Sequence, residues 1–169
     1  MQMLRARDLM QPDVVTVGLD TPILDVHRLF VEEEIHGAPV IDRDENVCGV
    51  VTSLDLVRAT REALEPGAAL TATSTYFHDE LSVGAWMHLP DDLQNKMANL
   101  CARDVMTSEL VMVPADMPLA EVATKMLDQR VHRVLVGTRE RMIGVLSTFD
   151  FLRVVAQLGT APRQTGYSR

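Results

Sequence analysis

Two stretches with the same pattern decide the fold: Gly-Val-Val-Thr-Ser-Leu-Asp at residues 49–55 and Gly-Val-Leu-Ser-Thr-Phe-Asp at residues 144–150. Each starts with a short apolar run, which is typical of a strand. Each then continues into Ser/Thr-x-x-Asp before a further apolar run, which is typical of the start of a helix. Two such junctions in one chain of 169 residues indicate an internal repeat.

The repeat extends upstream from both stretches. Ala-Arg-Asp-Leu-Met at 6–10 matches Ala-Arg-Asp-Val-Met at 102–106, and Ile35-His36 matches Val131-His132. The spacing changes by one residue in the turn region 42–47, where a deletion is tolerated. We therefore divide the chain into a first repeat at 4–60, an insert at 61–99, a second repeat at 100–158 and a flexible C-terminal tail at 159–169.

Each repeat reads as β-α-β-β-α, so the sequence predicts an α+β fold. Asp20-Thr21-Pro22 and Asp116-Met117-Pro118 are typical of helix starts, with a capping side chain before a first-turn proline. A lone repeat would bury too little surface, so we expect the two copies to pack around one shared core as a pseudo-twofold module. The expected strands are 14–17, 37–42, 47–52, 110–113, 133–136 and 142–147, and the expected closing helices are 54–64 and 149–157. The expected core-facing helix residues are Ile23, Val26, Phe30, Leu119, Val122, Ala123, Met126 and Leu127.

The insert is expected to be partly helical, with a loop at 71–75 and a helix from about 90 to 100. It contains Tyr76, Phe77 and Trp86, although aromatic residues make up only 4% of the chain. This concentration favours a packing role for the insert and leaves a lid over a ligand as the alternative.

Composition narrows the function classes. The formal net charge of −8 disfavours nucleic acid and anionic lipid as partners, because both require a basic face. No apolar run is long enough for a membrane span, and the N-terminus does not resemble a secretory signal. Two cysteines in unrelated contexts indicate a reduced, cytoplasmic setting. We find no metal-ligand spacing and no nucleophile–base set, so we expect no metal and no catalysis.

The ordered set of motifs, occurring twice, resembles the cystathionine-β-synthase (CBS) domain, and the two copies together resemble a CBS pair, or Bateman module. The resemblance covers both repeats and leaves out the insert and the tail. It implies regulatory binding of an adenosine-containing ligand in clefts between the repeats. AMP, ADP, ATP and S-adenosylmethionine all remain open, and no other cofactor is implied.

The resemblance also implies which residues bind the ligand. The family's Gly-φ-φ-(Ser/Thr)-x-x-Asp rule, where φ is apolar, assigns ribose and phosphate contacts to Thr52, Asp55, Ser147 and Asp150. Contacts to adenine or phosphate fall on Thr16, Gly37, Ala38, Pro39, Met112, His132, Arg133 and Val134. His132 and Arg133 are similar to phosphate-facing residues in energy-sensing kinase subunits. Because Gly37 stands where Arg133 stands in the second copy, we expect the two clefts to be unequal.

A simpler interpretation stays open at each motif. Thr52-x-x-Asp55 and Ser147-x-x-Asp150 also fit a capping box, in which these side chains only satisfy the helix N-terminus. Arg133 could form a surface ion pair, and His132 could cap a helix end. A cap and a ligand site can coexist at one junction.

We therefore expect a stand-alone, non-catalytic sensor that passes a conformational change to an unidentified protein partner. The resemblance implies a homodimer, a disc of four CBS repeats, with helices 54–64 and 149–158 at its interface. The alternative is a structural interaction module with empty clefts that contacts its partner through the insert.

Overall fold

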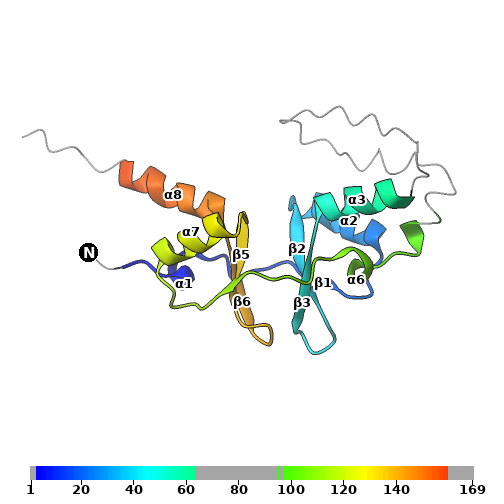
Figure 1. The fold of residues 1–169 in the computed structure, drawn as a ribbon, viewed down its shortest axis with the longest axis horizontal. Helices are drawn as coiled ribbons and strands as arrows, with labels where there is room; N and C mark the ends of the chain where they lie inside the picture. Colours follow the sequence, from blue (N-terminus) through cyan, green and yellow to red (C-terminus); the bar gives the residue numbers. More distant parts are fainter. Residues whose placement is uncertain (1–2, 64–94, 96, 160–169) are drawn as a thin grey trace, which may run out of the picture. The chain divides into compact units, whose positions relative to one another are not determined.

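The computed structural model describes residues 3–63, 95 and 97–159, and the chain divides into two compact units (Figure 1). The Asp55 unit comprises Val15–Leu110. The Asp150 unit comprises Val111–Arg169 together with Met1–Val14 from the start of the chain. The residues that open the first repeat therefore belong to the unit built from the second.

The two units have the same order of elements. The Asp55 unit contains β1 (Val17–Gly18), α2 (Ile23–Glu32), β2 (Gly37–Ile41), β3 (Val47–Thr52), α3 (Ser53–Ala63) and α6 (Ala102–Val105). The Asp150 unit contains α1 (Ala6–Leu9), β4 (Met112–Val113), α7 (Leu119–Asp128), β5 (Arg133–Gly137), β6 (Met142–Ser147) and α8 (Thr148–Gly159). This arrangement confirms the predicted α+β class and the tandem β-α-β-β-α repeat.

Each unit has a three-stranded sheet, β1-β2-β3 or β4-β5-β6. The first pair of strands in each sheet is parallel and the second pair is an antiparallel hairpin. Both hairpins carry an irregularity at the same place, between Val40 and Ile41 and between Val136 and Gly137. The matched registers bring the start of each middle strand beside the end of the following strand, where the helix begins.

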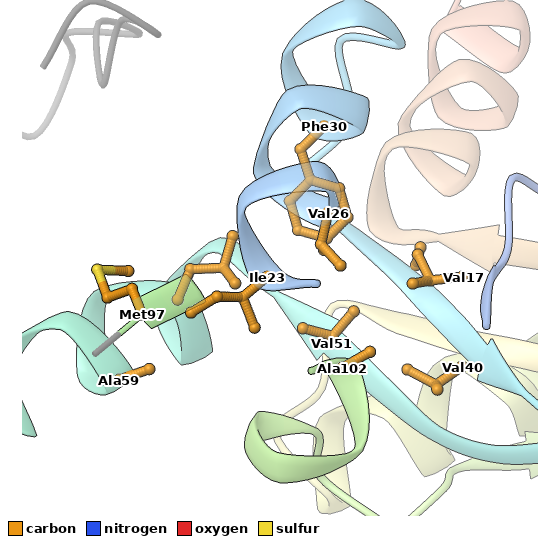
Figure 2. Close-up of a cluster of buried hydrophobic side chains, with 11 residues drawn as sticks. Val17, Ile23, Val26, Phe30, Val40, Val51, Ala59, Met97 and Ala102 are labelled. Carbon is orange, nitrogen blue, oxygen red and sulfur yellow. The ribbon is translucent and has the colours of Figure 1, made fainter. Parts of the chain in front are cut away.

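The buried side chains of the described residues form two clusters, one in each unit. One cluster joins residues of β1, α2, β2, β3 and α3 with Met97 and Ala102 (Figure 2). The other joins α7, β4, β5 and β6 with Ala6. The repeats exchange their leading segments, because Ala6 and Ala102 each complete the cluster built from the opposite repeat.

Backbone hydrogen bonds fix the exchanged segments in place. The Ala6 N–H donates to the Met117 carbonyl at 2.9 Å, and the Ala102 N–H donates to the Thr21 carbonyl at 2.9 Å. Residue 11 exchanges two further backbone bonds with Val145, as Thr107 does with Val50. Each leading segment therefore adds an isolated bridge to the last strand of the opposite repeat's sheet.

Several expected boundaries differ from the structure. The strands expected at 14–17 and 110–113 are only two residues long, at Val17–Gly18 and Met112–Val113. The helices expected to be capped by Asp20 or Thr21 and by Asp116 begin after Pro22 and Pro118, which provide no side-chain cap. Asp20 and Asp116 instead form ion pairs with the arginines of the exchanged segments, Arg103 and Arg7.

The apolar stripe of the second long helix is narrower than expected. Leu119, Val122 and Met126 are buried, but Leu127 is 77% exposed. Each helical residue is rotated by about 100° from its predecessor, so Met126 takes the core position and Leu127 points away. The corresponding stripe of α2, comprising Ile23, Val26 and Phe30, is buried as predicted.

Most of the insert and the tail lie outside the described residues. This applies to the loop at 71–75, to Tyr76, Phe77 and Trp86, and to residues 160–169. The end of the insert is described, and there Met97 is fully buried in the core of the Asp55 unit. In the described part of the chain, no helix is long and apolar enough to cross a membrane.

Candidate functional site

The junction between β3 and α3 holds Asp55 in a capping box. Oδ2 of Asp55 accepts the Thr52 N–H at 2.8 Å and the Thr52 hydroxyl at 2.6 Å, while the Asp55 N–H donates to that hydroxyl oxygen at 3.4 Å. Arg58 lies one turn further, with Nη1 3.8 Å from Oδ1. The predicted pair of Thr52 and Asp55 is therefore in direct contact, and both residues satisfy the start of α3.

The junction between β6 and α8 has the same design. Oδ2 of Asp150 accepts the Ser147 N–H at 2.8 Å and the Ser147 hydroxyl at 2.7 Å. Nη1 of Arg153 lies 3.6 Å from Oδ1, and the same guanidinium stacks over the Phe149 ring at 5.6 Å. Both aspartates are nearly enclosed, with Asp55 8% exposed and Asp150 4% exposed.

The middle strands start beside these junctions. Gly37 is opposite Thr52, and Arg133 is opposite Ser147. The carbonyls of the preceding histidines, His36 and His132, accept the first N–H of α3 and α8, respectively, each at 3.0 Å. The histidine backbones thus contribute to the helix starts, and the exposed Arg133 side chain is placed next to the second junction.

Other predicted residues take different positions. Ala38 and Val134 are buried in the two cores, so they can offer a ligand only backbone atoms. Pro39 lies opposite Val50 in the first hairpin. Thr16 directly precedes β1, and Met112 opens β4, where it pairs with Leu135.

The structure adds two polar residues that the sequence analysis did not select. Nε2 of Gln11 lies 3.3 Å from Oδ1 of Asp150, and Nζ of Lys125 donates to the Met112 carbonyl at 2.8 Å. Both occupy positions where the repeats differ, because Thr107 matches Gln11 and Leu29 matches Lys125. A residue-by-residue comparison of the repeats for polar differences would have found them.

Two hollows in the described residues lie away from the junctions. One, of about 680 Å³, is lined by Gly18–Pro22, Ile41–Asp44 and Arg103. The other, of about 420 Å³, lies along α7 and is lined by residues such as Glu121, Lys125 and Asp128. Neither hollow is lined by a residue of the two Ser/Thr-x-x-Asp motifs. The junctions are therefore identified as candidate sites by their hydrogen-bonding groups and not by these hollows.

The chemistry of a junction is that of an acceptor site. In each aspartate one oxygen is held by the helix start, while the other faces an arginine one turn along the helix. A carboxylate accepts hydrogen bonds from hydroxyl groups with charge-assisted strength. Among the described residues no group of three or more His, Cys, Asp or Glu side chains could hold a metal ion.

Comparison with known proteins agrees with this architecture. Residues 6–62 and 102–157 match the model of the CBS domain. The 5'-AMP-activated protein kinase subunit gamma-3 of Bos taurus is 27% identical over 85% of this chain, which spans only 24% of that subunit.

Solved structures share the fold. The crystal structure of CBSX2 in complex with AMP has a TM-score of 0.66 at 23% identity, covering 92% of this chain and 98% of that one. The CBS domain pair of protein MJ0100, in complex with 5'-methylthioadenosine and S-adenosyl-L-methionine, has a TM-score of 0.66 at 18% identity, covering 93% and 99%.

The fold and the junctions define a protein of two α+β repeats, each ending in a strand-to-helix turn with a buried aspartate. The two family matches together cover more than half of the sequence. The chain belongs to the CBS domain family and contains two tandem copies of the domain.

Proposed function

We propose that this protein is a non-catalytic regulatory sensor that binds an adenosine-containing ligand at its two aspartate junctions. The observation that carries the proposal is the hydrogen-bond arrangement at Asp55 and Asp150. At each junction the N–H and the hydroxyl of Thr52 or Ser147 both donate to Oδ2 of the aspartate. Oδ1 therefore takes no part in the cap. A ribose diol is a natural donor to such an oxygen.

The helix starts also favour a phosphate group. The N-terminal end of a helix carries a partial positive charge, which attracts anions. α3 and α8 have 11 and 12 residues, so each has a developed dipole at the junction. Arg133 adds a fixed positive charge beside α8, whereas Gly37 adds none beside α3. We therefore expect the Asp150 junction to bind polyphosphates more tightly relative to adenosine than the Asp55 junction does.

The known complexes support the class of ligand without choosing one member. CBSX2 has been crystallised with AMP, and the MJ0100 pair with S-adenosyl-L-methionine and 5'-methylthioadenosine. All three ligands contain the adenosine ribose. AMP, ADP, ATP and S-adenosylmethionine are therefore the candidates to compare.

A sensor has to pass its signal to a partner. In this proposal the first partner is a second copy of the same chain, which forms a homodimer. Phe149, Leu152 and Val155 on α8 and Leu54 on α3 are all exposed. Apolar residues gathered on one helix face mark an interaction surface. The proposed sensor is cytoplasmic and also acts on a second, unidentified protein.

The test is a thermal-unfolding scan with AMP, ADP, ATP, S-adenosylmethionine and GMP as a control. A ligand at 100 times its dissociation constant adds about 2.7 kcal/mol of stability, a shift of about 5–10 °C for a chain of this size. Stabilisation by adenosine compounds alone supports the sensor. No shift with any of them favours the alternative, an interaction module whose partner contacts the insert.

Substitutions separate binding from capping. Asp55→Ala and Asp150→Ala each remove a charged acceptor and should weaken nucleotide binding about 10- to 150-fold. Asp104→Ala is the matched control, because it removes a capping carboxylate, which accepts the Cys101 N–H at 2.8 Å, outside both junctions. If the Asp55→Ala and Asp150→Ala variants lose stability but retain affinity, the junctions are caps only.

A further inference from the structure

We propose that Gln11 makes the Asp150 junction a weaker and less selective reader of the ribose diol than the Asp55 junction. This inference rests on the proposed function and concerns how each aspartate accepts hydrogen bonds. Gln11 belongs to the first repeat by sequence, but it reaches Asp150 of the second repeat within one compact unit.

The first step is the number of donors on Oδ2. A carboxylate oxygen offers about two lone-pair sites to hydrogen-bond donors. In Asp150 both sites of Oδ2 are used, by the N–H and the hydroxyl of Ser147 at 2.8 and 2.7 Å. Both hydroxyls of a ribose would therefore have to donate to Oδ1.

The second step is the state of Oδ1. Nε2 of Gln11 lies 3.3 Å from this oxygen and occupies one of its two sites. Arg153 adds charge at 3.6 Å. One lone-pair site remains, so Asp150 can accept only one ribose hydroxyl unless Gln11 moves away.

The position of Gln11 is set by its backbone. Its N–H donates to the Val145 carbonyl at 2.8 Å, and its carbonyl accepts the Val145 N–H at 2.9 Å. The preceding residue, Met10, packs directly over Gly144. Because this segment is bonded to β6 immediately before the junction, the amide of Gln11 is held within reach of Asp150.

The Asp55 junction provides an internal comparison. Thr107 has the same backbone bonds to Val50, at 2.9 Å in both directions, that Gln11 has to Val145. Its side chain is shorter and has no amide group. In the described part of the chain, the ion pair at Oδ1 of Asp55 is with Arg58 at 3.8 Å, which is beyond hydrogen-bond distance. Both hydroxyls of a ribose can therefore be accepted there.

The consequence is a difference in selectivity between ribose and 2'-deoxyribose. Asp55 accepts both hydroxyls of a ribose, so loss of the 2'-hydroxyl removes one hydrogen bond there. Asp150 accepts only one hydroxyl, and in 2'-deoxyribose the 3'-hydroxyl can still donate that bond. One hydrogen bond to a charged carboxylate corresponds to about a 10- to 150-fold change in affinity. We expect the ratio of AMP to 2'-deoxy-AMP affinity to be larger at Asp55 by a factor in this range.

The experiment exchanges the two residues in chains with one active junction. Asp55→Asn keeps an oxygen for the Thr52 N–H and disables the first junction as a diol acceptor, and Asp150→Asn does the same for the second. Isothermal titration with AMP and 2'-deoxy-AMP then compares D55N with D55N/Q11T, and D150N with D150N/T107Q. We expect Q11T to raise the AMP preference about 10- to 150-fold and T107Q to lower it by a similar factor.

The outcomes separate the two proposals. Unchanged or oppositely shifted ratios, with AMP still bound, overturn the role of Gln11 alone. No AMP binding by the unmodified chain overturns the proposed function together with this inference.

A second measurement requires no disabled junction. In the unmodified chain, the Gln11 side-chain amide is assigned in an NMR spectrum as the signal missing from Q11T. Saturating AMP and saturating 2'-deoxy-AMP should shift this signal by similar amounts, because Asp150 accepts one hydroxyl from either ligand. An unmoved amide in the presence of bound AMP also overturns the role of Gln11.

Discussion

Gly49 lies so close to Met106 that a Cβ at residue 49 would be 2.7 Å from the methionine sulfur and 2.8 Å from the Thr107 carbonyl oxygen. Gly144 has the same relationship to Met10 and to the Gln11 carbonyl, at 2.7 and 2.8 Å. The glycine that opens each Gly-φ-φ-(Ser/Thr)-x-x-Asp motif therefore makes room for the exchanged leading segment. Its role in packing is independent of any ligand.

Gly49→Ala should destabilise the protein. The new methyl group meets a backbone carbonyl that is itself bonded to Val50, so the leading segment has to move, at a cost of about 1–3 kcal/mol. The measurement is the urea midpoint of unfolding. Gly18→Ala is the control, because its Cβ would meet only the Thr21 hydroxyl at 3.3 Å. Equal losses in the two variants would contradict the close-approach explanation.

Met97→Ala should destabilise the Asp55 unit by about 2–5 kcal/mol, because Met97 is fully buried in its core. The Thr60 hydroxyl lies 3.8 Å from the methionine sulfur, so the cavity would open against α3. Met3→Ala is the control, since Met3 is largely exposed. Thermal unfolding that changes by the same amount in both variants would show that the end of the insert contributes nothing to this core.

The turn after β2 should show a depressed carboxyl pKa. The Asn46 side chain, followed by the Asn46 and Asp44 backbone N–H groups, holds the pKa of Asp42 below its usual 3.8. The stability that this turn contributes is thus present above pH 3.8 and is lost as the pH falls through the folded value. Asn46→Ala should raise the pKa of Asp42, as measured by NMR titration of the carboxyl carbon.

A group in the other unit serves as the control for that titration. The pKa of Glu140 is lowered first by its own backbone N–H and then by the Thr138 side chain. It should stay depressed in the Asn46→Ala protein. A rise at both carboxyls would indicate a global change in structure rather than the loss of a local hydrogen bond.

The apolar face of α8 should determine the proposed homodimer. Leu152 is 60% exposed between Phe149 and Val155, and Leu152→Glu places a charge in that face. We expect the unmodified chain to be dimeric and L152E monomeric by light scattering after size exclusion, with thermal stability reduced only by loss of the dimer. Leu127→Glu on α7 is the control and should remain dimeric. A monomeric unmodified chain, or a dimeric L152E, would rule out this surface.

Much of the local structure could be predicted from the sequence. The strands Val47–Thr52 and Met142–Ser147 have the predicted bounds, and the α2 stripe is buried as expected. Alternation and helical periodicity are local patterns, so they can be read from neighbouring residues. The members of the pairs Thr52–Asp55 and Ser147–Asp150 are three positions apart, and a helix start brings residues at this spacing together.

The sequence by itself determined the duplicated β-α-β-β-α order, the two aspartate junctions and membership of the family, because each depends on residues close together in the chain. The tertiary structure alone decided that Ala6 and Ala102 complete opposite cores and that Gln11 reaches Asp150 across 139 residues. Such contacts depend on which surfaces remain to be covered after the sheets form, and no local pattern encodes that choice. The sequence also could not predict that Leu127 is exposed, because exposure depends on which face of α7 is covered and not on the hydrophobicity of the residue.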